Sequence, residues 1–141
     1  IAESCDHFYD TSFVEKLKVE MENILSEYAK AHKEELIGMI KTCIPMGRII
    51  ILKALLKLDE NNISILYDYF SDTSKQVKEV LVTILKDRKE EKERIVQKLS
   101  SKKAAERETA MIILCENKTD PEYKEILENA LNQNNSLCCK V

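Results

Sequence analysis

Apolar residues recur along the chain at spacings of one, three and four residues, which is the pattern of α-helices that bury one face. The clearest stretch, residues 48–56, is repeated at 77–85 and again at 106–114, so the offset is 29 residues each time. The apolar positions that coincide are Ile51 with Val80, Leu52 with Leu81 and Ala110, Leu55 with Ile84 and Ile113, and Leu56 with Leu85 and Leu114. The pattern predicts a helix that recurs with this period.

A second helix is predicted to follow each of these. Its apolar positions also repeat, as Leu66, Tyr67 and Phe70, then Ile95, Val96 and Leu99, then Ile126, Leu127 and Ala130. Residues typical of helix caps lie between the predicted helices. Residues 59–62 offer N-cap side chains, and Thr73 with Gln76 matches a capping box. Asp120-Pro121 is typical of a helix start. Each repeat is therefore predicted to be a pair of short helices.

Residues 1–44 follow the pattern less clearly. Their apolar positions fit either one helix over about residues 12–42 or two helices divided by a turn near residues 31–33. No glycine or proline marks such a turn. We favour the divided form, because it gives every helix the length of its neighbours. Residues 134–141 are interpreted as the start of a truncated further repeat, and the chain as a piece of a longer protein.

The helix pairs, with runs such as Val77-Lys78-Glu79-Val80-Leu81, resemble HEAT-type repeats of the short bacterial variety. The resemblance covers residues 45–133. It implies an all-α fold, a right-handed α-solenoid of stacked antiparallel helix pairs, whose second helices line a concave face that holds a partner. In this interpretation residues 1–141 form a single domain with a degenerate first unit (1–44), three repeats (45–73, 74–102 and 103–133) and the truncated unit (134–141).

The composition excludes several other classes of protein. The 141 residues include two glycines and two prolines, too few for the turns of a β-sandwich or for a glycine-rich phosphate loop. No apolar run approaches the roughly 18 residues of a membrane-spanning helix. The five cysteines are irregularly spaced and odd in number, which is a poor disulfide framework and favours a reducing, cytoplasmic location.

In a solenoid, the solvent-facing rows of the second helices are candidate binding positions. Matched by the repeat offsets, the rows are Ile65, Arg94 and Glu125; Asp68, Gln97 and Glu128; and Tyr69, Lys98 and Asn129. Each row changes its chemistry from repeat to repeat, whereas a nucleic-acid groove needs one row to be basic in several repeats. We therefore predict a protein or peptide partner, and the candidate contact residues are Ile65, Asp68, Tyr69, Arg94, Lys98 and Glu125.

Charge is distributed unevenly over the predicted repeats. Residues 74–102 carry 9 basic and 5 acidic side chains, a net charge of +4, although the whole chain has a net charge of −3. The basic side chains near the second helix of this repeat are Lys86, Arg88, Lys89, Lys92, Arg94 and Lys98. They fit either a site for an acidic peptide or a phosphate, or a solvated face with internal pairs such as Glu90 with Arg94, and we favour the solvated face.

The sequence offers little support for catalysis. The only histidines are His7 and His32, and in a continuous helix His32 would lie about 16 Å along the axis from Cys43, too far for a nucleophile–base pair. Cys5-Asp6-His7 lacks the doubled spacing of a structural zinc site. We predict no catalytic residue, no metal and no cofactor.

Among the aromatic residues, Tyr67 and Phe70 keep the core spacing and are predicted to pack, whereas Tyr69 faces elsewhere and suits a binding contact. The favoured hypothesis is a non-catalytic scaffold that binds a protein or peptide. Two alternatives stay open: a nucleic-acid-associated module that uses residues 74–102, and the regulatory portion of an enzyme whose catalytic domain lies outside this chain.

Overall fold

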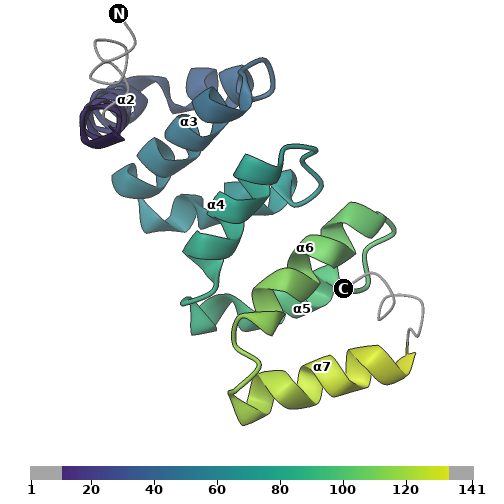
Figure 1. The fold of residues 1–141 in the computed structure, drawn as a ribbon. Helices are drawn as coiled ribbons and strands as arrows, with labels where there is room; N and C mark the ends of the chain where they lie inside the picture. The colour runs from purple at the N-terminus through teal and green to yellow at the C-terminus, as the bar shows by residue number, and fades with distance from the viewer. Residues whose placement is uncertain (1–10, 134–141) are drawn as a thin grey trace, which may run out of the picture. The chain divides into compact units, whose positions relative to one another are not determined.

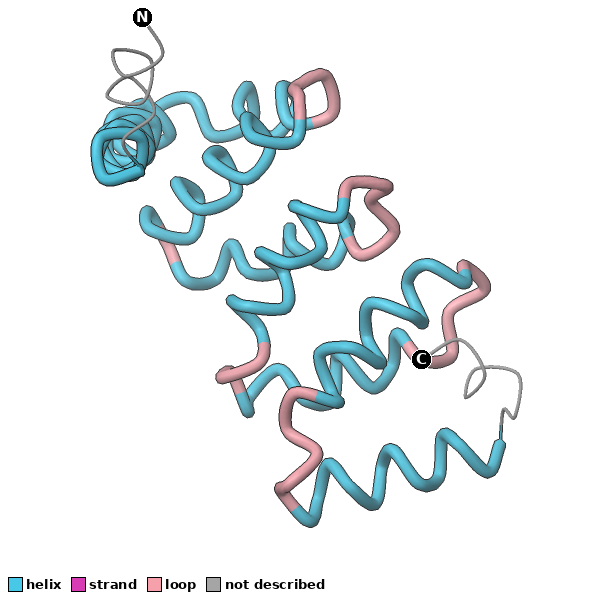
Figure 2. Tube along the Cα trace, in the orientation of Figure 1, coloured by secondary structure: helices cyan, strands magenta, loops and turns pink. Residues whose placement is uncertain are grey.

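The computed structural model describes residues 11–133, and every regular element in this range is a helix (Figure 1). The elements are α2 (Thr11–Ile40), α3 (Pro45–Leu58), the 3₁₀ helix η1 (Glu60–Tyr69), α4 (Lys75–Leu85), the 3₁₀ turn η2 (Lys89–Glu91), α5 (Lys92–Lys98), α6 (Ala104–Cys115) and α7 (Pro121–Gln133). Figure 2 shows no strand among the described residues. The predicted all-α class is confirmed. Cys5-Asp6-His7 and the predicted unit 134–141 lie outside the described residues.

The chain divides into two compact units, the first ending at Ile65 and the second beginning at Leu66. The division falls inside η1 and therefore inside the predicted repeat 45–73. Each unit is described by itself below.

The first unit is built from α2 and α3, which pack along each other. Its core contains Ala29, Leu36 and Ile40 from α2 together with Leu52 and Leu55 from α3, all of them buried. The backbone of α2 leaves helical geometry at His32 (φ −131°, ψ 34°). This break lies in the predicted turn, but no loop separates the two halves of the helix.

The second unit is centred on α6, which packs against α4, α5 and α7 (Figure 1). The repeated apolar positions supply its core: Leu81 and Leu85 on α4 and Ala110 and Leu114 on α6 are all buried. In the second elements of the repeats, Leu66, Tyr67, Phe70, Ile95 and Leu127 are buried too. The 29-residue pattern therefore identified core residues correctly at these positions, whereas other repeated positions are half-buried: Leu56, Val80, Ile84, Val96, Leu99, Ile126 and Ala130.

The turn residues correct the sequence predictions at two places. The segment after α3 was predicted as an α-helix, but η1 is a 3₁₀ helix. Its opening residues are poor helix formers whose side chains bond the backbone instead. Asp59 accepts from the Asn61 backbone N–H (2.9 Å), and Asn62 donates its Nδ2 to the carbonyl of Leu55 (2.7 Å).

The second correction concerns the start of α4, which the sequence assigned to a capping box of Thr73 and Gln76. The N-cap is Ser74, whose hydroxyl accepts from the Val77 N–H (3.4 Å). Asp72 accepts from the Ser74 N–H (2.8 Å), and this turn places Ser74 at the helix start. By contrast, Asp120 caps α7 as predicted, accepting from the Glu122 N–H (3.1 Å) with Pro121 as the first helical residue.

Candidate functional site

The predicted contact residues differ in how far they reach solvent. Asp68, Arg94 and Glu125 are exposed, and Tyr69 and Lys98 are half-buried in the same unit. Ile65, the last residue of the first unit, is half-buried as well. Their role in binding stays a prediction, and among their contacts are those of Arg94 and Lys98 with aromatic rings.

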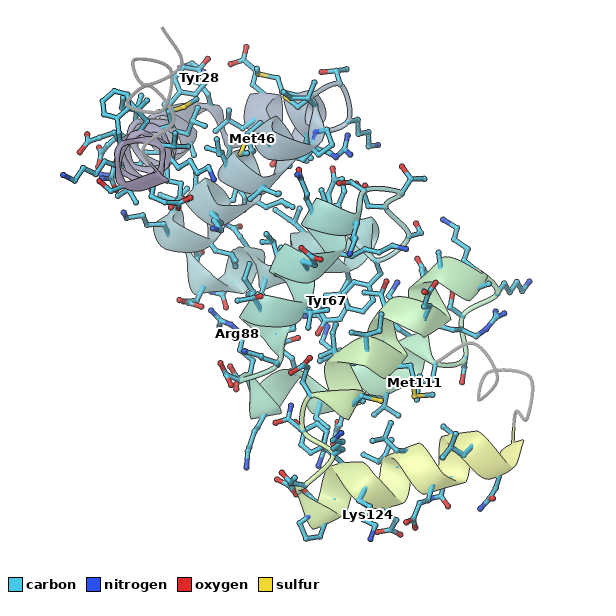
Figure 3. The ribbon with its side chains drawn as sticks, viewed as in Figure 1. Tyr28, Met46, Tyr67, Arg88, Met111 and Lys124 are labelled. Carbon is cyan, nitrogen blue, oxygen red and sulfur yellow. The ribbon has the colours of Figure 1, made fainter. Side chains whose placement is uncertain are left out.

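Arg94 and Lys98 lie against the aromatic core of the second unit. The Arg94 guanidinium sits over the Tyr67 ring, 4.3 Å from its centroid, and the Lys98 ammonium lies 5.9 Å from the centroid of Phe70. The two rings stack with their centroids 4.9 Å apart. Tyr67 lies in the interior of the unit (Figure 3), so the prediction that Tyr67 and Phe70 are packing residues is confirmed.

Glu91 is a buried carboxylate that the sequence did not single out. Its Oε2 accepts from the Tyr67 hydroxyl (2.6 Å) and from Arg94 Nη1 (3.3 Å). Burial, followed by the hydrogen bond to Glu91, raises the pKa of Tyr67 well above its usual range. Because the Tyr67 hydroxyl stays protonated, it remains a hydrogen-bond donor to Glu91. We interpret Tyr67, Glu91 and Arg94 as a structural network.

The basic side chains of residues 74–102 are largely paired with carboxylates. Lys89 reaches Asp120 (3.2 Å) and Lys92 reaches Glu122 (3.0 Å), both at the start of α7. The hydrogen bond from Lys89 lowers the pKa of Asp120. The solvated, internally paired face is therefore what the geometry favours over an open phosphate site.

The particular pairs differ from the predicted Glu90–Arg94 pair. Arg94 pairs with Glu91, and Glu90 lies 3.9 Å from Arg88. The prediction was wrong because the spacing of four residues holds on a regular α-helix, whereas Glu90 and Glu91 belong to the 3₁₀ turn η2 that precedes α5.

Two loops of the second unit are tied together across one repeat length. Asn117 donates its Nδ2 to the carbonyl of Lys86 (2.6 Å), and Lys89 donates to Asp120 (3.2 Å). Each bond joins residues 31 positions apart, which is close to the offset of the sequence repeat. The turn after α4 and the turn after α6 are thus neighbours.

A groove of about 710 Å³ opens between α4 and α6. From α4 and the turn before it, the lining residues are Thr73, Lys75, Lys78, Glu79, Val82 and Thr83. From α6 and its C-cap they are Glu108, Ile112 and Glu116. We call this feature the α4–α6 groove.

The lining of the α4–α6 groove is apolar at its centre and charged with opposite signs at its edges. Val82 and Ile112 are half-buried and come one from each helix. Lys75 and Lys78 stand on α4, whereas Glu108 stands on α6. Lys75 also lies 3.8 Å from Glu79, an exposed pair that contributes little stability. Such a groove is suited to a peptide segment with an apolar side chain and charges of both signs.

Sequence reasoning missed this groove because it considered only the second helices. A signal was present in the first helices, since the same offset of 29 residues places Glu79 over Glu108 and Thr83 over Ile112. All four residues line the groove. Matching the solvent-facing rows of both helices would have found it.

The described residues contain no arrangement suited to catalysis by a thiol. Cys43 and Cys115 are free and half-buried, and burial raises the pKa of Cys115, which disfavours the thiolate. His32 is exposed and lies 3.2 Å from Glu35.

Within residues 11–133, no group of three or more His, Cys, Asp or Glu side chains is placed to hold a metal ion. None of the helices in the same range combines the length and the apolar character needed to cross a bilayer. Comparisons with protein-family models, with curated proteins and with solved structures find no match to the chain.

Proposed function

We propose that this chain is a non-catalytic scaffold of HEAT-type helix pairs, arranged as an α-solenoid, that binds a segment of another protein in the α4–α6 groove. The stacking interpretation is supported by the packing of α4 on α6 and by the loop bonds between residues 31 positions apart. These contacts are what neighbouring repeats of a solenoid make.

The observation that carries the binding proposal is the composition of the groove. Val82 and Ile112 offer half-buried apolar side chains. The α4 side carries Lys75 and Lys78 with Glu79, and α6 with its C-cap carries only the acidic Glu108 and Glu116. We expect the bound segment to place an apolar side chain between the helices, an acidic residue near Lys78 and a basic residue near Glu108. Because the charged edges face solvent, binding should weaken as salt is added.

The paired basic residues weigh against the nucleic-acid alternative. Lys89, Lys92 and Lys98 each have a carboxylate partner, so a phosphate would have to displace it. A salt titration with duplex DNA tests this alternative: salt-dependent binding at low ionic strength would revive it. The cytoplasmic location and the regulatory-domain alternative stay predictions.

Affinity capture from an extract of the source cells tests the proposal. The immobilised wild-type chain is compared with Thr83→Arg, which fills the groove from an exposed position on α4, and with Lys124→Glu as a control. Lys124 is exposed on the side of α7 that points away from α6 (Figure 3). We expect the wild type and Lys124→Glu to retain the same proteins and Thr83→Arg to lose them. Retention of no protein, or equal retention by Thr83→Arg, would refute the proposal.

A further inference from the structure

The first half of α2 carries a row of apolar side chains that nothing in the described chain covers. The row, here called the α2 stripe, consists of Val14, Leu17, Met21, Ile24 and Tyr28, all of them exposed. Leu17 is 48% exposed and Ile24 is 65% exposed, although leucine and isoleucine are among the residues most often buried in proteins. Side chains project from α2 on the sides away from α3 (Figure 3).

The spacing within the α2 stripe alternates strictly between three and four residues. Steps of three, four, three and four lead from Val14 to Tyr28, which is the a/d spacing of a coiled-coil seam. This seam is separate from the face that packs on α3, where Ser26, Ala29 and Leu36 are buried. The helix thus has two apolar faces, and only one has a partner in the described chain.

The stripe ends one turn before the backbone of α2 leaves helical geometry. Tyr28 is its last member, and the backbone breaks at His32. At the other end, every side chain from Ser12 to Leu17 is exposed, so the first turns of α2 are surrounded by solvent. Most of the stability of a helix in a protein comes from packing of its apolar face, and pairing along the stripe would supply such packing to these turns.

We propose that the α2 stripe binds the same stripe of a second copy of this chain, forming a symmetric helix pair. An identical a/d row is its own complement, because each knob meets a hole formed by the same residues on the other copy. Complete burial of the exposed surface of the stripe and of Phe13 on both copies would remove at most on the order of 1,000 Å² from water. This area is below the roughly 1,200–2,000 Å² of a standard specific interface, so the dimer forms in a concentration-dependent way. This inference does not depend on the α4–α6 groove.

Sedimentation velocity of the 141-residue chain between about 1 and 200 µM tests the dimer. Leu17→Glu and Val19→Glu form a matched pair, because both side chains are 48% exposed on α2 but Val19 stands outside the stripe. We expect Leu17→Glu to raise the dimer dissociation constant at least about tenfold and Val19→Glu to leave it within about twofold. Circular dichroism of both variants shows whether helix content is kept. A wild-type chain that stays monomeric throughout overturns the proposal, as does an equal effect of both substitutions.

A second measurement locates the contact. A photo-reactive phenylalanine replaces Met21, and isotopically heavy and light chains are mixed before irradiation. Cross-links from this position to α2 of the other chain are expected. Heavy–light cross-links found only to other helices overturn the proposal even if the chain is dimeric.

Discussion

Each compact unit contains a tyrosine that donates a hydrogen bond to a glutamate, but the two bonds lie in different surroundings. In the first unit, Tyr28 donates to Glu35 (2.8 Å) at an exposed site on α2. In the second unit, Tyr67 donates to Glu91 (2.6 Å) in the buried interior. The chemistry of the two pairs is the same, and only the second is shielded from water.

The two units differ in how they bury apolar side chains and in which contacts join their helices. In the second unit the repeated apolar positions are buried or half-buried, and charged contacts such as Lys89–Asp120 and Lys98–Glu106 join its helices. The first unit packs one face of α2 on α3 and leaves the α2 stripe exposed. A polar contact is worth most where water cannot replace it, so substitutions should affect the two units unequally.

The largest expected difference comes from placing a carboxylate at a buried leucine of one unit and at an exposed leucine of the other. Leu85 is buried in the second unit, whereas Leu17 is exposed in the first. Leu85→Asp leaves a charge without a partner in the core and should cost on the order of 4 kcal/mol or more, enough to unfold the unit. Leu17→Asp should leave the thermal midpoint of the monomer nearly unchanged. Thermal unfolding followed by circular dichroism measures both, and an unchanged midpoint for Leu85→Asp would mean that Leu85 is not in the core.

Removal of the two tyrosine hydroxyls probes the comparison directly. Tyr67→Phe deprives buried Glu91 of its closest donor and should lower the free energy of unfolding by about 2 kcal/mol. Tyr28→Phe removes an exposed bond and should have no measurable effect. Urea denaturation distinguishes the two outcomes. Equal effects would show that burial does not separate the two sites.

Reversal of the charge at Lys98 tests the ion pairs of the second unit. Lys98 lies 3.4 Å from Glu106, and both side chains are mostly covered. The like charges should therefore cost about 1 kcal/mol. Lys102→Glu, at an exposed position, is the control. Urea denaturation of the two variants gives the difference, and the contact has no energetic role if they are equally stable.

The smallest expected effect is a change in pH dependence. The hydrogen bond from the Ser101 hydroxyl, aided by Lys98, lowers the pKa of Glu106. A carboxyl whose pKa is lower in the folded state stabilises the fold above its unfolded pKa of about 4.3, and this contribution is lost as the pH falls through the folded pKa.

Ser101→Ala should therefore reduce stability at pH 7 and differ less from the wild type as the pH falls through the acid range. Thermal midpoints measured over this range check the convergence. Ser100→Ala, at an exposed neighbouring position, should match the wild type at every pH. A difference between Ser101→Ala and wild type that stays constant with pH would contradict the assigned cause.

The sequence predicted the helical class and the core, because α-helical spacing is a local property. Leu81, Ala110 and Leu114 are buried as the repeat requires. The break at His32 was placed correctly but could not be told from a full turn. The N-cap lies one residue after the predicted Thr73. Asp72 accepts from the Ser74 backbone N–H, and Ser74 then caps the helix by accepting from the Val77 N–H.

The candidate site was less predictable, because it depends on which side chains meet across different elements. Whether Arg94 is available to a partner is affected by Tyr67 and Glu91, which lie on other elements. The α4–α6 groove exists only because two helices 29 residues apart lie side by side.

By itself, the sequence determined that the described part of this protein is helical and that apolar residues such as Leu81, Ala110 and Leu114 are buried. These properties follow from spacing along a single helix. The tertiary structure alone decided the partners of Lys89, Lys92 and Lys98, the 3₁₀ form of η1 and the exposure of the α2 stripe. The physical reason is that charge pairing and solvent exposure depend on residues from other elements that packing brings close. The spacing of residues within one helix does not specify which residues these are.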